Sequence, residues 1–224
     1  MHRKPVLVVV CILLTIRTIN LFATMQSFVN ATDAPAHVQL KDITIIVSSC
    51  DKYAEIWPAF FACLFRNWSS LQSTNKSTPL ILLTGHKTFS HPRVQTFNTQ
   101  RNEDWSYNLK RVLKHVKTPY VLYLQEDYLL HQPVNEERLA SVIQHMRLCP
   151  KIAYCQLNEV PSNHYIKANK QLQKKAPFRG YIKVASRASL QAALWRKDVL
   201  YAVLRTGENP WEFEKKCPKE GGKP

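Results

Sequence analysis

The chain has 224 residues, a formal net charge of +15 and a hydrophobic share of 45%, which fit one globular domain with an N-terminal appendage and exclude a disordered chain. Five glycines against thirteen prolines exclude a collagen-like or low-complexity chain. The positive charge is compatible with a protein whose substrate is anionic, such as a nucleoside diphosphate; a nucleic-acid binder is the weaker alternative, because the sequence contains no basic helix and no aromatic RNA-binding motif.

The N-terminus has the pattern of a signal anchor. Residues 1–4 are basic and are expected to stay in the cytosol. Residues 5–25 are mostly apolar over the ~20 residues that a membrane-spanning helix needs. No good small-x-small cleavage site follows, which favours an uncleaved anchor over a cleaved signal peptide. We therefore expect a single-pass type II membrane protein facing the lumen of the Golgi or endoplasmic reticulum; the alternative is secretion after signal cleavage.

Glycosylation motifs follow the predicted span. Asn30, Asn67 and Asn75 each begin an Asn-X-Ser/Thr sequon, and we expect them to carry N-glycans in the lumen. Residues 26–41 are small and polar and are expected to form a short stem. A disulfide such as Cys149–Cys155 is permitted in that compartment, although sequence alone does not give cysteine connectivity.

From residue 42 onward, short apolar runs alternate with segments of helical periodicity. Short β-branched runs bounded by turn residues predict strands at 42–49, 79–85, 94–99, 119–124, 152–157 and 189–195. Apolar residues at helical spacing predict helices at 56–68, 104–116, 134–148 and 197–206, with a helical start at 210–214. Residues 165–179 are polar and lysine-rich and are expected to form a loop. The alternation predicts an α/β domain over 42–214, with a mostly parallel, Rossmann-like sheet flanked by helices, and a disordered tail at 215–224.

Two carboxylates directly follow the predicted strand at 119–124. An apolar strand is not expected to hide both Glu126 and Asp127, so they should emerge where the strand ends. In open α/β sheets, ligands bind at the carboxyl ends of the strands. A carboxylate pair there can hold a divalent cation, Mn²⁺ or Mg²⁺, whose other ligands are water and diphosphate oxygens. The alternative is that both acids simply face solvent where the strand meets a loop.

The stretch from Ile43 to Glu214 resembles the nucleotide-binding core of GT-A-fold glycosyltransferases, close to the inverting, family-2-like enzymes. In that resemblance the first strand and its loop contact the base and ribose of a nucleotide-sugar donor, and the start of the helix at 104–116 faces the nucleotide. From the residues alone, Asp51 is either such a contact or a helix N-cap before Tyr53. The resemblance implies these nucleotide-sugar contacts: Ser48, Ser49, Asp51, Asp104, Trp105, Asn108, Gln125 and Glu126.

The same resemblance gives the acidic segment a role. Gln125-Glu126-Asp127 stands where the family has its Asp-x-Asp-like metal motif. The match implies that Asp127 ligates the metal and that Gln125 and Glu126 lie nearer the ribose. Gln125 departs from the family pattern, because the family has an acid there.

The second part of the resemblance lies near the end of the chain. Residues 189–195 and 207–214 resemble the acceptor-side strand and the acidic segment after it, which supplies the catalytic base in inverting enzymes. Glu214 is the first choice for that base and Glu212 the second. The match implies Gln191, Trp195 and Trp211 as acceptor contacts. The alternative is an ordinary capped helix start, in which the acids favour the helix dipole.

The resemblance implies inverting, metal-assisted transfer of a hexose-type sugar from a nucleoside diphosphate donor to a hydroxyl of a glycan or glycoconjugate. The partners expected are that donor, that acceptor and a membrane through the N-terminal helix, with no nucleic acid. The alternative function is a catalytically inactive, truncated glycosyltransferase-like protein that acts as a lumenal binding or scaffolding partner. It is kept because the motif has one aspartate in place of two and because the chain ends soon after the proposed base.

Overall fold

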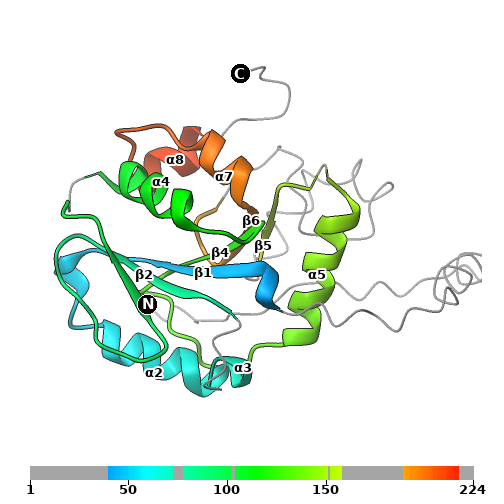
Figure 1. Cartoon of the computed structure of the whole chain (residues 1–224), viewed down its shortest axis with the longest axis horizontal. Helices are drawn as coiled ribbons and strands as arrows, with labels where there is room; N and C mark the ends of the chain where they lie inside the picture. Colours follow the sequence, from blue (N-terminus) through cyan, green and yellow to red (C-terminus); the bar gives the residue numbers. More distant parts are fainter. Residues whose placement is uncertain (1–39, 73–77, 102–103, 151, 158–188, 217–224) are drawn as a thin grey trace, which may run out of the picture.

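The structure is a computed structural model that describes residues 40–72, 78–101, 104–150, 152–157 and 189–216 (Figure 1). Within these residues a six-stranded sheet has the order β3-β2-β1-β4-β6-β5. The strands are β1 (Ile43–Ser48), β2 (Leu80–Thr84), β3 (Gln95–Asn98), β4 (Tyr120–Gln125), β5 (Tyr154–Gln156) and β6 (Ala193–Arg196). Each lies within or beside a predicted strand, so the α/β prediction is confirmed.

The sheet is mostly parallel, with one exception. β1 pairs in parallel with β2 and β4, and β2 pairs in parallel with β3. β6 is antiparallel to both β4 and β5. Since β6 runs the other way, its first residues lie at the sheet edge where β1 and β4 end.

Helices cover both faces of the sheet (Figure 1). One face packs against α2 (Trp57–Asn67), α3 (Ser69–Gln72) and α5 (Glu136–Leu148), and the other against α4 (Trp105–His115), α7 (Lys197–Val203) and α8 (Pro210–Lys216). Within β1, Ile45 and Val47 belong to the first core and Ile46 to the second. Successive residues of a strand point to opposite faces, so burial on both faces explains the unbroken β-branched run.

Side-chain caps set several helix boundaries. Asp104 Oδ1 accepts a hydrogen bond from the backbone N–H of Tyr107 at 2.8 Å, and α4 therefore begins at Trp105. Asn135 Oδ1 caps α5 in the same way, accepting from Arg138 N–H at 2.9 Å. The cap explains why α5 begins after the predicted position of 134.

Some predictions lie outside the described residues: the membrane span at 5–25, Asn30, Asn75, the loop at 165–179, and all but the first residues of the 215–224 tail. None of the helices in the described ranges has the length and hydropathy to cross a bilayer. No disulfide joins Cys149 to Cys155 in this structure, so the suggested bridge is absent from it.

The structure disagrees with glycosylation at Asn67. This residue is 9% exposed, and its side-chain nitrogen donates hydrogen bonds to the carbonyl oxygens of Cys63 at 3.0 Å and Leu130 at 2.7 Å. That nitrogen is the atom to which an N-glycan would be attached. The sequon has the right residues, but the fold has buried its acceptor.

Candidate functional site

The ends of β1 and β4 lie side by side at the point where the strand order reverses. Ser48 and Gln125 are paired in register at these ends. β2 and β3 follow on one side of β1, whereas β4 lies on its other side. In open α/β sheets, ligands bind outside the carboxyl ends of the strands at such a reversal. We call residues 48–51 and 125–127 the switch-point edge, and it is the candidate functional site.

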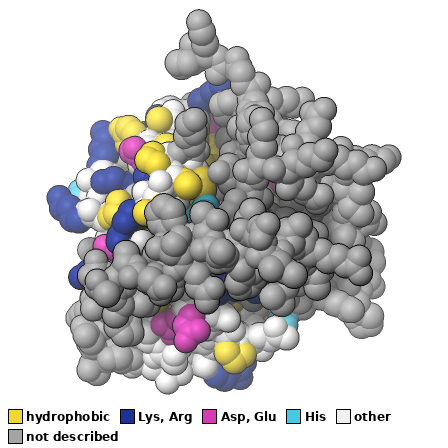
Figure 2. Space-filling model, turned by 90° about the vertical axis from the view of Figure 1, so that its right-hand side faces the viewer, with side chains coloured by type: hydrophobic (Ala, Val, Ile, Leu, Met, Phe, Trp, Pro, Cys, Tyr) yellow, Lys and Arg dark blue, Asp and Glu magenta, His cyan; other side chains and the backbone are white. Residues whose placement is uncertain are grey.

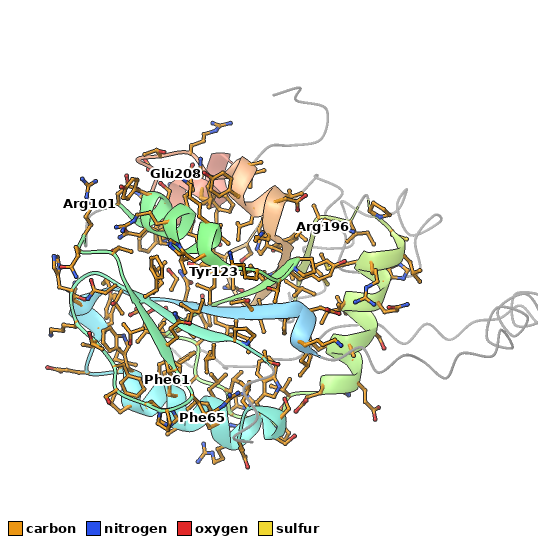
Figure 3. All side chains as sticks on the ribbon, viewed as in Figure 1. Phe61, Phe65, Arg101, Tyr123, Arg196 and Glu208 are labelled. Carbon is orange, nitrogen blue, oxygen red and sulfur yellow. The ribbon has the colours of Figure 1, made fainter. Side chains whose placement is uncertain are left out.

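On the α4 side of the sheet, a buried tyrosine supports this edge. The indole N–H of Trp105 donates to Tyr123 Oη at 3.0 Å and to Ser48 Oγ at 3.2 Å. Gln125 also forms a side-chain hydrogen bond with the Tyr123 hydroxyl. Tyr123 lies between the sheet and α4 (Figure 3), and burial raises the pKa of its hydroxyl well above the usual value, so the group keeps its proton.

On the α2 side, a second tryptophan supports the neighbouring serine. Trp57 Nε1 donates to Ser49 Oγ at 2.8 Å, and the Ser49 hydroxyl is hydrogen-bonded to the Glu126 carboxyl. Because consecutive strand residues face opposite sides of a sheet, Ser48 and Ser49 are held by tryptophans from opposite helical layers. Tryptophan side chains from both helical layers therefore fix the start of the loop after β1.

The two acids after β4 have different environments. Glu126 is only 6% exposed, and burial raises the pKa of its carboxyl from 4.5 to about 7, with a further upward contribution from the charge of Asp127. Asp127 is exposed to solvent in the turn that follows the strand. The expectation that both acids emerge is thus wrong for Glu126, which is buried beside Ser49.

The acids of the edge fit a cation that takes few protein ligands. Among the described residues, no group of three or more His, Cys, Asp or Glu side chains is placed to hold a metal ion. The exposed carboxylate of Asp127 can supply one or two oxygens, and Glu126 is its direct neighbour in the chain. Mn²⁺ or Mg²⁺ bound in this way would complete its coordination with water and phosphate oxygens.

Asp51 joins the loops that follow β1 and β2. Its carboxylate accepts hydrogen bonds from the backbone N–H of His86 at 2.8 Å and of Lys87 at 3.0 Å. His86 Nδ1 also lies 3.3 Å from the carboxylate. The N-cap alternative for Asp51 is wrong, because Cys50 occupies the N-cap of the short 3-10 helix η2 (Asp51–Tyr53).

Two other predicted nucleotide contacts shape the start of α4. Asp104 is its N-cap, and Asn108 is 7% exposed and donates from Nδ2 to the carbonyl oxygen of Arg101 at 2.9 Å. Both side chains organise the chain before the helix. Trp105 lies between them in sequence, and its indole reaches the switch-point edge.

The structure brings α8 to the same edge. Glu214 Oε1 accepts from the backbone N–H of Leu190 at 2.6 Å and from Ser189 Oγ at 3.2 Å, immediately before β6. The ring of Phe213 lies 5.6 Å from that of Trp105. α8 therefore packs against Trp105, whose indole binds the ends of β1 and β4. The Glu214 contact explains why β6 begins later than predicted, since Leu190 N–H binds Glu214 and not a neighbouring strand.

The turn before α8 is fixed by a buried acid. Glu208 is 5% exposed, and its Oε1 accepts a hydrogen bond from the backbone N–H of Arg205 at 2.6 Å (Figure 3). Gly207 adopts a φ of 87°, a conformation that L side chains rarely take. This turn sets the orientation of α8 relative to α7.

The remaining acceptor-side predictions separate into different environments. Glu212 forms a reciprocal capping pair with Asn209: Glu212 Oε2 accepts from Asn209 N–H at 3.0 Å, and Asn209 Oδ1 accepts from Glu212 N–H at 2.9 Å. Trp195 is 2% exposed and packs 4.4 Å from the ring of Tyr154, so in this structure it is a core residue and not an acceptor contact. Trp211 is 71% exposed, and Gln191 is half-buried at the start of the β6 segment.

Tyr123 and Trp57 help to hold the switch-point edge in place, although no sequence motif marks either of them. Tyr123 was part of the apolar run of β4, and Trp57 lay at the start of a predicted helix. The available signal for Tyr123 was alternation. It lies two residues before Gln125 and therefore faces the same side of the sheet.

Charge on the visible surface is mixed. On the face in Figure 2, the described Lys and Arg side chains lie mainly along the left edge, and acidic side chains gather near the bottom. Hydrophobic side chains lie among the basic ones.

No protein-family model matches the chain, and no curated protein matches it in sequence. Among solved structures, it is similar to the mannosyltransferase PcManGT from Pyrobaculum calidifontis in complex with GDP-Man and Mn²⁺, with 14% identity over 72% of this chain and a TM-score of 0.46. This chain spans 46% of the length of that enzyme. It is also similar to a CMP:2-keto-3-deoxy-manno-octonic acid synthetase complexed with CTP, with 12% identity over 77% of this chain and 82% of that one, and a TM-score of 0.41.

Proposed function

We propose that this protein is a GT-A-type glycosyltransferase that moves a sugar from a nucleoside diphosphate donor to a hydroxyl of a glycan or glycoconjugate, with inversion. One observation carries the proposal. The exposed carboxylate of Asp127 lies at the strand-order reversal, at the same edge of the sheet to which Glu214 anchors α8. This arrangement supports a donor site and an acidic group at one end of the fold.

The donor would lie along the switch-point edge. Ser48 and Gln125, which Trp105 and Tyr123 hold on the α4 side, would contact the base and ribose. Glu126, with a pKa of about 7, carries a proton part of the time at neutral pH and can donate a hydrogen bond to a ribose oxygen. Asp127 would hold Mn²⁺ or Mg²⁺, which when bound neutralises charge on the leaving diphosphate.

The transfer step needs a base for the acceptor hydroxyl. The hydroxyl oxygen attacks the anomeric carbon on the face opposite the leaving group, the bond from that carbon to the phosphate oxygen breaks, and the diphosphate leaves with the electron pair. The hydroxyl proton passes to a carboxylate. Glu214 is the first candidate, because it lies at the correct edge, and Glu212 is the second. Trp211 has an exposed indole that can stack on a sugar face.

The cellular setting belongs to the same proposal. A signal anchor at residues 5–25 would hold the domain on the lumenal side of a Golgi or endoplasmic reticulum membrane, where nucleotide sugars and glycan acceptors meet. Glycans on Asn30 or Asn75 would establish that side of the membrane. Their absence, together with cytosolic recovery of the chain, would contradict it.

A donor screen tests the function. The melting temperature of the full-length chain would be measured with each of several nucleoside diphosphates and nucleotide sugars, GDP-mannose and CTP among them, with and without Mn²⁺. We expect one nucleotide to raise the melting temperature in a Mn²⁺-dependent manner and its sugar to be transferred or hydrolysed. No shift with any nucleotide on a folded protein would refute the proposal.

A second function is a nucleotide-sugar-binding protein without transfer activity. The observation in its favour is that both candidate bases have structural contacts: Glu214 anchors the β6 segment, and Glu212 caps α8. Donor binding without any hydrolysis or transfer across an acceptor panel would support this function over the enzyme.

A further inference from the structure

The last residue of α2 binds the loop after β4 through both its side chain and its backbone. Asn67 Nδ2 donates to the carbonyl oxygen of Leu130 at 2.7 Å, and the carbonyl oxygen of Asn67 accepts from Val134 N–H at 2.7 Å. Asn67 is 9% exposed and Leu130 is 3% exposed, so the side-chain contact is shielded from water. One residue therefore holds two points of the loop formed by residues 126–134, which we call the carboxylate loop.

The carboxylate loop carries Glu126 and Asp127 between two restrained positions. At its beginning, Gln125 is paired with Ser48 in the sheet, and Tyr128 N–H donates to the carbonyl oxygen of Gln125 at 3.3 Å. The next restraint along the chain that involves Asn67 is at Leu130. Asp127 lies in the turn between these positions, so a shift of Leu130 changes where the turn can point.

The chemistry of the contact requires an amide at position 67. Nδ2 has two N–H groups, and they meet two carbonyl oxygens, those of Leu130 and of Cys63 at 3.0 Å. A carboxylate cannot donate to either oxygen, and an alanine would leave a buried carbonyl without its donor. Asparagine therefore suits position 67, because its side-chain amide donates both hydrogen bonds in a buried environment.

We propose that Asn67 is a positioning residue that fixes the carboxylate loop, and with it the direction of Asp127, and that it is not a glycan acceptor in the folded protein. The loop restraint stands on the contacts alone. Its effect on cation binding rests on the proposed function, in which Asp127 holds the metal.

A neighbouring contact offers a matched control. Glu136 Oε1 accepts from Ser69 Oγ at 2.9 Å and from Ser70 N–H at 3.0 Å, which ties α3 to the first turn of α5. This contact lies just past the carboxylate loop and involves a similar number of hydrogen bonds. Glu136→Ala should therefore cost stability without releasing Leu130.

Hydrogen exchange tests the restraint without any ligand. Asn67→Ala and Asn67→Asp in the full-length chain should speed amide exchange within residues 126–134 by about tenfold, because the loop loses its buried donor. Glu136→Ala should leave exchange in that peptide unchanged while speeding it at the start of α5. Equal exchange in 126–134 for wild type and both Asn67 variants would overturn the proposal.

A second measurement separates positioning from simple loss of stability. Mn²⁺ would be titrated into wild type, Asn67→Ala and Glu136→Ala well below their melting temperatures, alone and with GDP or UDP. We expect weaker Mn²⁺ binding in Asn67→Ala only. If wild type binds Mn²⁺ and Asn67→Ala binds it equally well, the positioning role is wrong; if wild type binds none, the proposed function fails while the exchange result still decides the restraint.

Mass spectrometry tests the glycan part. The full-length chain would be expressed through the secretory pathway of eukaryotic cells, and peptides with Asn30, Asn67 and Asn75 would be scored for glycan occupancy. We expect Asn67 to be unmodified in folded protein whatever the state of the other two. A glycan on Asn67 in folded protein would contradict the buried placement of its amide.

Discussion

Trp105 donates its indole N–H to the hydroxyl of Tyr123 across 3.0 Å and thereby joins α4 to the strand that ends at the switch-point edge. Phe213 of α8 packs edge-on against the same indole, 5.6 Å between ring centroids. A single side chain thus contacts both α8 and β4. A movement of α8 would therefore displace Trp105 and, through it, the ends of β1 and β4.

We expect Trp105→Phe to lower stability by about 1–2 kcal/mol, because a phenyl ring keeps part of the packing but the N–H donor to Tyr123 and Ser48 is lost. Tyr123→Phe should have an effect of similar size, and the double variant should cost less than the sum, because both remove the same hydrogen bond. Denaturant unfolding measures all three. Trp57→Phe is the control: it acts on the opposite face through Ser49, so combined with Tyr123→Phe it should be additive.

Asp127→Asn should abolish metal-dependent nucleotide binding and leave the melting temperature within about 2 °C of wild type, because substitutions at exposed positions rarely change stability by more than ~0.5 kcal/mol. Asp198→Asn is the matched control, since Asp198 is also exposed but lies in the first turn of α7, at the opposite end of β4 from Asp127. Nucleotide binding would be measured calorimetrically with and without Mn²⁺. A large loss of stability in Asp127→Asn would show a structural role.

Glu214 can be tested with two substitutions that separate anchoring from catalysis. Glu214→Gln keeps an acceptor for Leu190 N–H and should stay folded and bind donor while losing transfer. Glu214→Ala should lose transfer and also about 1–3 kcal/mol of stability, because the N–H is left without an acceptor. Transfer assays and thermal melts on both variants give the answer. Full turnover in Glu214→Gln would leave Glu214 as an anchor and move the base to Glu212.

The buried carboxyl of Glu126 should make stability depend on pH in the absence of metal. Its pKa is raised from 4.5 to about 7 in the folded protein, so between these values the folded state holds a proton that the unfolded chain has released. Stability should therefore fall as pH rises from about 4.5 to 7, by at most on the order of 3 kcal/mol, and then level off with respect to this group. Glu126→Gln should flatten that window. Urea unfolding in EDTA at several pH values measures it, and identical profiles for the two proteins would exclude a raised pKa.

Much of the fold could be predicted because burial leaves a local record in the sequence. The unbroken apolar run of β1 reports a strand covered on both faces, and Asp104 reports a helix start through its own cap. The apolar run of β4 likewise indicated that Glu126 and Asp127 follow the end of a strand, although it did not indicate that Glu126 is buried. These signals are local, since each depends on residues within a few positions along the chain.

Only the tertiary structure decided how distant residues meet. In the folded chain β6 runs antiparallel to β4, and Glu126 is buried beside Ser49. Trp195 lies in the core, and Asn67 binds Leu130. Each outcome depends on a contact between segments far apart in the chain, and no local pattern records such a contact. For that reason the sequence by itself determined the elements and the presence of two acids directly after β4, whereas packing determined which polar side chains are exposed and which support the fold.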